Sequence, residues 1–427
     1  MANPIQSIRG MNDILPGETP YWQHIEAVVR ETMQQYGFSE IRTPVLEKTE
    51  LFCRSVGEVT DIVEKEMYTF TDRNGDSLSL RPENTASTLR AGIEAGLFYN
   101  QIQKLWYAGP QFRHERPQRG RLRQFHQVGV EIIGIDNPAI DAELLLLFSH
   151  VLKKLNLTPY VNLEINSLGT KEDRLRYREA LVTYFKRYEA QLDEECQRRL
   201  QTNPLRLLDS KNPDMQALIS DAPAMQTYLS DASKRHFELL CAYLNDNQLA
   251  FTVNPRLVRG LDYYCLTVFE WVTTHLGAQG TVCAGGRYDG LIEQLGGHAA
   301  PGIGFAMGME RLIALLQDLH PLDTTLNAPD VYMILSGENA LPFGLSLSER
   351  LRHTYPHLRL STDLSNASFK SQMKKADKSG APLVLIIGEQ EMVAEHITVK
   401  YLREDKPQQQ LTADAVMQLL GNQLYPS

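Results

Sequence analysis

Strand candidates follow one another closely in the first third of the chain. Residues 67–71 and 77–80 have the composition of β-strands, and an Asn-Gly pair lies in the turn between them. Two longer apolar candidates follow at residues 104–112 and 124–134. Short turns can join antiparallel strands, whereas parallel strands need long crossovers. The spacing therefore predicts an antiparallel sheet rather than a series of strand–helix–strand units.

An amphipathic helix precedes these strands. Apolar side chains recur at helical spacing from Tyr21 to Tyr36, and Gly37 provides a stop. Residues 39–47 then predict a strand, which Pro44 confines to the edge of a sheet. A helix beside an edge strand offers a contact for a partner subunit, although a helix packed on its own core would show the same periodicity.

The pattern of expected helices and strands changes twice in the rest of the chain. Residues 170–248 have a mostly helical pattern and predict an inserted helical module. Strand signals then return, and a linker follows at residues 321–330. We therefore expect an α+β domain with an antiparallel sheet at 1–325, interrupted by the helical insertion at 170–248. Beyond the linker, strands alternate with helices, which predicts a separate C-terminal α/β domain at 330–427.

Charge and cysteine content exclude several classes of protein. The chain has 43 Lys and Arg against 52 Asp and Glu, a net charge of −9, yet a basic loop at residues 113–123 can still bind phosphates. The five cysteines form no CxxC pair, which argues against a zinc framework. No run of 18 apolar residues occurs, so we expect no contact with a membrane. The first residues lack the apolar core of a signal peptide, so we expect a cytoplasmic location.

The common phosphate-binding loops are absent from the sequence, so arginine side chains are the next candidates for binding phosphate. The sequence has no GxxxxGK[ST] loop, and the glycines at residues 302–308 lack GxGxxG spacing. A guanidinium group binds phosphate oxygens through two donors and keeps its charge. Arg113 ends an apolar strand, Arg259 lies in an apolar and aromatic segment, and Arg311 opens a helix whose N-terminus would favour an anion. Taken singly, each would more often be a surface ion-pair partner.

The strand candidate at residues 125–133 supplies a second group of polar side chains. Alternation places Phe125, Gln127, Gly129 and Glu131 on one face. Since Gly129 has no side chain, we expect an open notch between an amide and a carboxylate, suited to a small cationic or hydrogen-bond-donating ligand. The alternative is a polar strand that faces solvent.

Several motifs resemble those of a known family. The sequences at 112–115, 123–127 and 304–311 are similar to motifs 2 and 3 of class II aminoacyl-tRNA synthetases. Those at 257–264 and 284–291 resemble the two signatures of histidyl-tRNA synthetases. Ser-Ile-Arg-Gly-Met-Asn-Asp at 7–13 and Arg-Pro-Glu at 81–83 fit the same family.

This resemblance implies a fold, a reaction and a set of partners. The fold would be a catalytic antiparallel sheet with a helical insertion and an anticodon-binding α/β domain, in a homodimer formed through the 21–36 helix and the Pro44 strand. The reaction would be the ATP-dependent ligation of L-histidine to tRNA(His) through histidyl-adenylate, with release of pyrophosphate and AMP. Mg²⁺ would bridge the phosphates of ATP, with protein ligands that the sequence does not identify.

The resemblance also implies roles for individual residues. Arg113 and Arg259 would be catalytic, and Glu83 would bind the α-amino group of histidine, while Glu131 and Tyr264 would bind its imidazole. The insertion would grip tRNA without an editing activity. ATP would contact Arg113, Phe125, Arg259 and Arg311; histidine would contact Glu83, Thr85, Arg113, Gln127, Glu131, Arg259, Tyr263 and Tyr264; tRNA would contact Arg116, Gln118 and Arg119. In the C-terminal domain, Lys370, Lys374, Lys375 and Lys378 share one face of an expected helix and are either further tRNA contacts or a solvated helix surface.

Two positions depart from the family pattern. Asn84 stands where a glycine is common, and we expect its side chain to cap the helix that begins at Thr85. Cys265 and Leu266 follow the tyrosine pair where Asn or a small polar residue is common, so the family pattern does not fix the orientation of the tyrosines.

Two alternatives keep the fold without the reaction. One is a non-catalytic paralogue that regulates ATP phosphoribosyltransferase, which typically lacks the C-terminal domain. The other is a protein that binds tRNA-like RNA. The presence of Arg259, Arg311 and residues 331–427 favours the synthetase.

Overall fold

The chain divides into two compact units, Met1–Leu322 (unit 1) and Asp323–Ser427 (unit 2). The computed structural model describes residues 5–57, 60–210, 212–261, 263–277, 280–321 and 328–424. Within these ranges no helix is long and apolar enough to cross a membrane.

Unit 1 is built on an eight-stranded sheet with the order β1-β5-β6-β11-β10-β9-β7-β8. The five neighbouring pairs from β5 to β7 are antiparallel, as predicted, and the two outermost pairs, β1 with β5 and β7 with β8, are parallel. The strands are β1 (Ser39–Glu40), β5 (Gln103–Phe112), β6 (Gln124–Ile133), β7 (Asn162–Ser167), β8 (Thr252–Val253), β9 (Cys265–Val272), β10 (Thr281–Arg287) and β11 (Gly302–Gly308).

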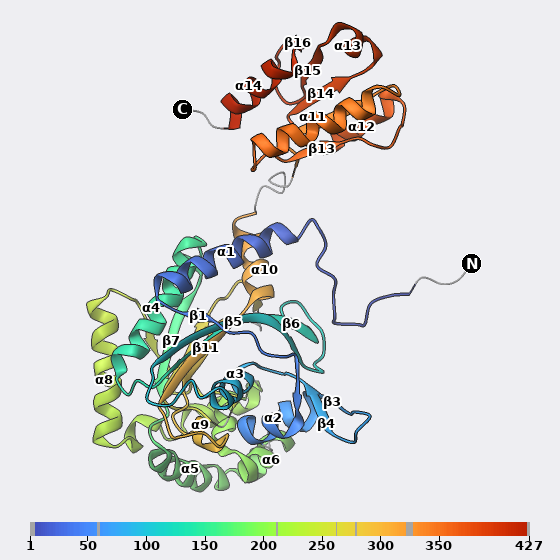
Figure 1. Ribbon diagram of the computed structural model, residues 1–427. Coiled ribbons are helices and arrows are strands. Elements are labelled where there is room, and N and C mark those ends of the chain that lie inside the picture. Colours follow the sequence, from blue (N-terminus) through green and yellow to red (C-terminus); the bar gives the residue numbers. More distant parts are fainter. Residues whose placement is uncertain are drawn as a thin grey trace. The chain divides into compact units, whose positions relative to one another are not determined.

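One face of this sheet is covered by four helices, α1 (Thr19–Gln35), α4 (Pro138–Lys154), α8 (Asp231–Asp246) and α10 (Met309–Leu319) (Figure 1). Local signals set their ends. Gly37, which has a positive φ, follows α1. At the start of α4, the Asn137 side chain accepts a hydrogen bond from Ala139 N. Apolar residues of the helices and of β6, β9 and β11 form the main core of the unit.

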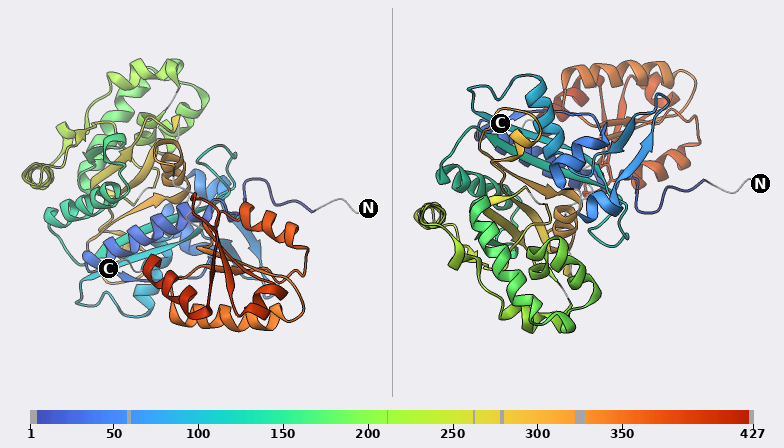
Figure 2. Two further views of the ribbon diagram at one scale, coloured as in Figure 1. Left: turned by 90° about the horizontal axis from the view of Figure 1, so that it is seen from above. Right: turned by 90° about the horizontal axis from the view of Figure 1, so that it is seen from below.

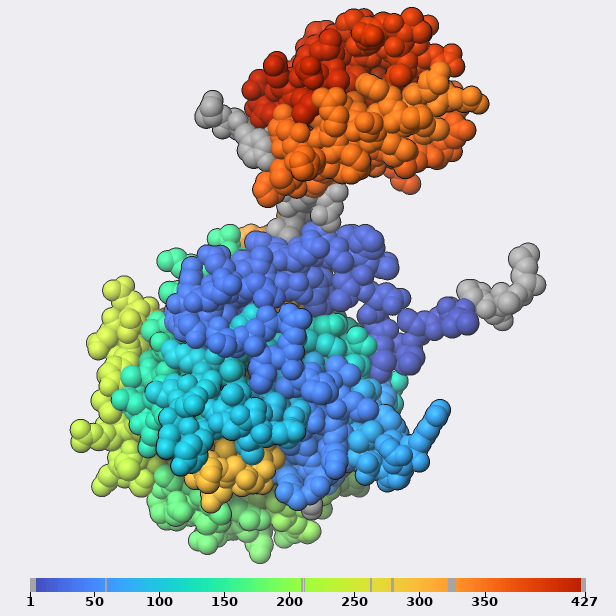
Figure 3. Space-filling view, viewed as in Figure 1, coloured from blue at the N-terminus to red at the C-terminus, as the bar shows by residue number. Residues whose placement is uncertain are grey.

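Residues 39–47 do not form the single interrupted strand that we predicted. Their first part, β1, lies at the edge of the large sheet, where it pairs with β5. Their last part belongs to β2 (Leu46–Lys48), which pairs with β4 (Ser77–Leu80) in a separate sheet completed by β3 (Tyr68–Thr71). The hairpin of β3 and β4 projects from the surface in Figure 3.

The segment predicted as an insertion contains a small core of its own. Apolar residues from Tyr177 to Leu229 pack together, and in both views of Figure 2 this green segment gathers on one side of unit 1. In α8, by contrast, Leu240 and Leu244 lie in the main core. The helices of this segment before α8 are α5 (Lys171–Lys186), η3 (Glu189–Gln191), α6 (Glu194–Thr202), η4 (Pro204–Asp209), η5 (Pro213–Met215), α7 (Gln216–Ser220) and η6 (Met225–Tyr228).

Shorter helices complete unit 1. Those beside the open face of the sheet include α3, whose first turn carries part of the candidate site described below. They are α2 (Thr49–Val56), η1 (Ile62–Glu66), α3 (Thr85–Glu94), η2 (Thr158–Tyr160) and α9 (Leu291–Gln294).

Unit 2 is the α/β domain that the alternation predicted. Its five-stranded sheet has the order β13-β12-β14-β15-β16, with parallel pairs around β12 and antiparallel pairs around β15. Apolar side chains pack on both faces of the sheet. The elements are β12 (Val331–Leu335), α11 (Ala340–Thr354), β13 (Leu360–Thr362), α12 (Phe369–Lys378), β14 (Leu383–Ile387), α13 (Glu389–Ala394), β15 (Ile397–Tyr401), β16 (Gln409–Leu411) and α14 (Ala413–Leu424).

Candidate active site

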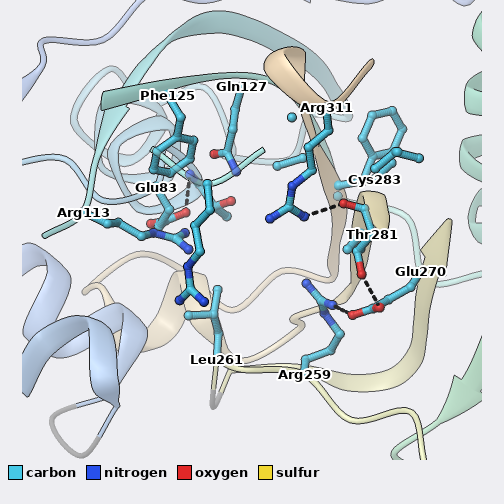
Figure 4. Close-up of a pocket in the computed structure, with 18 of the residues that line it drawn as sticks. Glu83, Arg113, Phe125, Gln127, Arg259, Leu261, Glu270, Thr281, Cys283 and Arg311 are labelled. Carbon is cyan, nitrogen blue, oxygen red and sulfur yellow. Dashed lines mark hydrogen bonds and ion pairs between the residues drawn. The ribbon is translucent and has the colours of Figure 1, made fainter. Parts of the chain in front are cut away.

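A cavity of about 390 Å³ lies over the face of the large sheet that the four helices leave open. It brings together side chains from distant segments of the chain (Figure 4). Every residue predicted to contact ATP or histidine lines it: Glu83, Thr85, Arg113, Phe125, Gln127, Glu131, Arg259, Tyr263, Tyr264 and Arg311.

Strand β6 forms the floor of the cavity by alternation. Phe125, Gln127 and Glu131 face the cavity, while Val128 and Val130 lie in the main core on the other side. The two faces are therefore those that the sequence predicted.

The open notch that we predicted beside Gly129 is filled by an aromatic ring. Tyr107 of β5 is the cross-strand partner of Gly129, and a Cβ at Gly129 would lie 2.3 Å from the Tyr107 Oη. The same hydroxyl donates a hydrogen bond to Glu131 Oε1 at 3.1 Å. The missing side chain of Gly129 thus makes room for a tyrosine of the protein, which holds the carboxyl group of Glu131.

Glu131 is a deeply buried carboxyl group. Its residue is 1% exposed, and Tyr288 donates a second hydrogen bond to it. Burial raises the pKa of Glu131 to about 8, against the opposing effect of hydrogen bonds such as that from Tyr288. The folded protein therefore holds the Glu131 proton more tightly than an exposed carboxyl group would.

Glu83 occupies the start of α3. Its carboxylate accepts hydrogen bonds from the backbone N–H of Thr85 at 2.7 Å and of Ala86 at 2.9 Å, so Glu83 satisfies the first donors of the helix. Burial nevertheless raises its pKa. The prediction that Asn84 caps α3 is wrong, because the Asn84 side chain instead accepts hydrogen bonds from Thr43 and Arg81.

The three predicted arginines approach the cavity from different sides. In Figure 4 the guanidinium group of Arg113 lies opposite those of Arg259 and Arg311. Arg113 donates to Pro82 O at 2.9 Å and lies over the ring of Phe125, and Arg311 donates to Gly120 O at 2.9 Å. Burial lowers the pKa of both, and the charge of Arg113 lowers that of Arg311 further. Such a group of like charges favours a polyanionic ligand.

Arg259 is held by a carboxylate that sequence reasoning missed. It forms an ion pair with Glu270 of β9, whose other oxygen accepts a hydrogen bond from Thr281 Oγ1 at 2.9 Å. Burial opposes the charge of Arg259, but the attraction of Glu270 and of the neighbouring tyrosines outweighs it, so the pKa of Arg259 is raised. The sequence alone does not indicate this role for Glu270, because the ion pair forms only when the loop that contains Arg259 folds back along β9.

Comparison with known proteins agrees with this geometry. The family model for histidyl-tRNA synthetase matches residues 10–312, and that for an anticodon binding domain matches residues 330–423. The crystal structure of apo histidyl-tRNA synthetase from S. aureus is 37% identical in sequence, covers 97% of this chain and 99% of its own, and superimposes with a TM-score of 0.81. The chain belongs to the histidyl-tRNA synthetase family.

More distant structures share the fold of this histidyl-tRNA synthetase family. A histidyl-tRNA synthetase from Nostoc sp. PCC 7120 is 19% identical, with 99% and 100% of the two chains covered and a TM-score of 0.69. An ATP phosphoribosyltransferase regulatory subunit/histidyl-tRNA synthetase from Bacillus halodurans is 21% identical, with 91% and 99% covered and a TM-score of 0.65.

The residues predicted to contact tRNA lie outside the cavity lining. Arg116, Gln118 and Arg119 are exposed in the loop between β5 and β6, where Arg119 Nη2 lies 2.7 Å from both carboxylate oxygens of Asp318. In unit 2, α12 carries Lys370, Lys374, Lys375 and Lys378, all exposed. For this member of the histidyl-tRNA synthetase family these contacts stay predictions.

Proposed function

We propose that this protein catalyses the ATP-dependent ligation of L-histidine to tRNA(His) through histidyl-adenylate, releasing pyrophosphate and AMP. The observation that supports the proposal is that one cavity contains the three predicted arginines, together with Arg121, beside buried carboxyl groups that include Glu83 and Glu131. The arginines suit a triphosphate, and the carboxyl groups suit an amino group and an imidazole.

ATP would lie against the arginine side of the cavity. Phe125 would stack on adenine, Arg311 would hold the γ-phosphate, and Arg113 and Arg259 would hold the α-phosphate from opposite sides. Because the guanidinium groups are already fixed by Gly120, Pro82 and Glu270, they need little rearrangement as charge develops on the phosphoryl oxygens.

Histidine would occupy the carboxyl side of the cavity. Glu83, with Thr85 beside it, would bind the α-amino group, and Glu131 with Tyr264 would bind the ring nitrogens. Gln127 and Tyr263 complete the pocket. A site that pairs the polar atoms of its substrate rejects analogues lacking them by roughly 10⁴–10⁵, so no editing site is required.

The reaction would proceed in two transfers. A carboxylate oxygen of histidine attacks the α-phosphorus of ATP, and the bond to the bridging oxygen breaks to release pyrophosphate. A hydroxyl of the terminal ribose of tRNA then attacks the histidyl carbonyl carbon, and AMP leaves. Arg113 and Arg259 line the position of the α-phosphate in both steps and act by orientation and charge.

Mg²⁺ would enter the cavity together with ATP, as in other enzymes that bind nucleotides. Mg²⁺ is commonly held by one or two carboxylates plus substrate phosphates. The described residues contain no cluster of three or more His, Cys, Asp and Glu for a protein-only cage, but Glu270 and Glu310 both line the cavity. Both carboxylates are already engaged, Glu270 by Arg259 and Thr281 and Glu310 by His126, so Mg²⁺ would be held mainly by the phosphates of ATP, whose charge it would neutralise when bound.

The remaining partners follow from the family. We propose that tRNA(His) contacts Arg116, Gln118 and Arg119 and the anticodon-binding unit 2, and that the protein is a cytoplasmic homodimer formed through α1 and residues 39–47. Sedimentation equilibrium should give twice the chain mass of 48.4 kDa.

Histidine-dependent ATP–pyrophosphate exchange tests the proposed function, because it requires adenylate formation but not tRNA. Exchange that needs L-histidine, followed by transfer to tRNA(His), is the expected result. A regulatory paralogue, or a protein that only binds RNA, would give no exchange, and that outcome would refute the proposal.

A further inference from the structure

Asn84 is a buried polar residue to which the proposed reaction gives no part. Its neighbours Glu83 and Thr85 line the candidate active site, whereas Asn84 is not among the described residues of that lining. The residue is 1% exposed, and both polar atoms of its side chain have hydrogen-bond partners. A buried amide that is paired in this way holds the segment of chain that carries it.

The amide oxygen of Asn84 accepts hydrogen bonds from two side chains. Thr43 Oγ1 donates to Asn84 Oδ1 at 2.7 Å, and Arg81 Nη1 donates to the same oxygen at 3.0 Å. Arg81 Nη1 also donates to Thr43 Oγ1 at 3.0 Å, so the three side chains form a closed triangle of hydrogen bonds. The amide nitrogen makes a longer contact, at 3.4 Å, with Thr88 Oγ1 of α3.

Arg81 anchors this triangle to the surrounding strands. Its Nε donates to Pro110 O at 2.9 Å, and its backbone N–H donates to Val45 O at 3.0 Å. Gly109 leaves the space that the guanidinium group needs, because a Cβ there would lie 2.6 Å from Arg81 Nη2. The triangle is therefore fixed to β5 and to the segment that joins β1 to β2.

The triangle lies beside the turn that carries the proposed amino-group site. The carboxylate of Glu83 accepts hydrogen bonds from the backbone N–H groups of Thr85 and Ala86, and both of these bonds lie within the turn. The side chain of Asn84 instead ties the turn to Thr43, which is 41 positions earlier in the chain. Without that tie the turn would have more freedom in the empty site. Histidine would then have to select one of its conformations, which weakens the apparent affinity.

We propose that Asn84 is a positioning residue, which fixes Glu83 against Thr43 and so prepares the binding site for the α-amino group before histidine arrives. The proposal rests on the proposed function, which assigns Glu83 to that amino group. Asn84 acts through Glu83 and does not itself contact the substrate.

Steady-state pyrophosphate exchange by Asn84→Ala tests the proposal. Alanine removes the amide group without backbone strain, because the φ of residue 84 is −120°. The KM for histidine should rise about tenfold, whereas the KM for ATP and kcat should stay within about twofold of wild type. An unchanged KM for histidine would overturn the proposal.

Thr49→Val is the matched control for a general loss of stability. The Thr49 hydroxyl lies 2.8 Å from Ser77 Oγ and 3.0 Å from Ser79 Oγ, so this variant also removes side-chain hydrogen bonds, but outside the turn of Glu83. It should lower the urea midpoint, as Asn84→Ala does, and keep the wild-type KM for histidine. A similar rise of this KM in both variants would assign the effect of Asn84 to stability and overturn the proposal.

An analogue without the amino group shows whether Asn84 acts through Glu83. Imidazolepropionate has the ring and the carboxylate of histidine but no α-amino group. In displacement calorimetry without ATP, Asn84→Ala and wild type should bind imidazolepropionate equally, while Asn84→Ala binds histidine about tenfold more weakly. An equal loss of affinity for both ligands would mean that the whole pocket is disturbed, which would contradict the proposed role.

Thr43→Val tests the contact through which Asn84 is proposed to act. Valine has the shape of threonine without the hydroxyl, so the variant should also weaken histidine binding. The double variant Thr43→Val/Asn84→Ala should bind histidine no more weakly than Asn84→Ala, because both changes break the same contact. Losses that multiply in the double variant would show that Asn84 acts independently of Thr43 and would refute the proposed positioning.

The two assays keep this proposal separate from the proposed function. Absence of exchange in the wild type would refute the proposed reaction. Histidine binding by calorimetry needs no ATP and would still decide whether Asn84 positions Glu83.

Discussion

Replacing Glu131 with glutamine should make unit 1 less sensitive to alkaline pH. Burial raises the pKa of Glu131 from an ordinary value of 4.5 to about 8, so the folded chain holds this proton more tightly than the unfolded chain does. The stability that the group contributes is complete below its unfolded pKa and is lost as pH rises toward its folded pKa. Tyr107 and Tyr288 donate to different oxygens of Glu131; glutamine keeps one of these acceptors, its amide N–H can donate to the other hydroxyl, and it does not titrate.

The size of the effect follows from the shift. One pKa unit corresponds to about 1.36 kcal/mol. Between about pH 6 and the folded pKa of about 8, roughly two pH units, Glu131 is protonated in the folded chain but ionised in the unfolded chain, and raising the pH further to about 9 adds little. The free energy of unfolding of Glu131→Gln should therefore rise relative to wild type by roughly 2–3 kcal/mol over this range. Asp141, whose pKa burial raises to about 6, is present in both proteins and cancels in the comparison.

Tryptophan fluorescence during urea unfolding measures the stability of unit 1, which contains Glu131. All tryptophans of the chain, Trp22, Trp106 and Trp271, lie in unit 1. Glu179→Gln, which replaces an exposed carboxylate on α5, is the matched control and should follow wild type at every pH. A difference between Glu131→Gln and wild type that stays constant from acid to alkaline pH would refute the reasoning.

Three further variants test single contacts. Arg259→Ala should lower ATP–pyrophosphate exchange about 10²–10³-fold while calorimetry shows histidine affinity within a few fold, and normal exchange would remove its catalytic role. Gly129→Ala should destabilise by about 1–3 kcal/mol because its methyl group meets Tyr107, and a wild-type urea midpoint would contradict this. Arg287→Met should cost about 3–5 kcal/mol because it leaves the buried carboxyl group of Asp141 without its ion pair. Adding Asp141→Asn should recover part of that loss, and an unchanged urea midpoint for the double variant would contradict it.

Elements with local signals could be predicted from the sequence. Helix α1 has a continuous apolar face and a glycine stop, and β5 and β6 are long apolar strands that follow one another in the sequence, joined by the loop at residues 113–123. The alternation of β6 correctly separated the cavity face from the core face. In each case the information lies within a few neighbouring residues.

Elements whose partners are distant could not be predicted in the same way. Residues 39–47 divide between two sheets because β1 pairs with Leu105 and Trp106, whereas β2 pairs with β4. Likewise, Tyr107 fills the space at Gly129 only because the register of β5 and β6 sets the two residues opposite each other. Sequence periodicity fixes the face of a side chain but not the strand that it meets.

The meeting of the three arginines depends on both kinds of information. Strand β5 ends next to Arg113, and β11 ends three residues before Arg311; because Phe112 pairs with Gln124 and Gly308 with Gln127, both arginines lie near the same end of β6. Arg259, however, precedes β9, whose first residues lie at the opposite end of the sheet from Thr281. Its ion pair with Glu270, near the end of β9, brings the guanidinium group back along the sheet. Glu270, which no local sequence signal marks, therefore places Arg259 with the other two arginines.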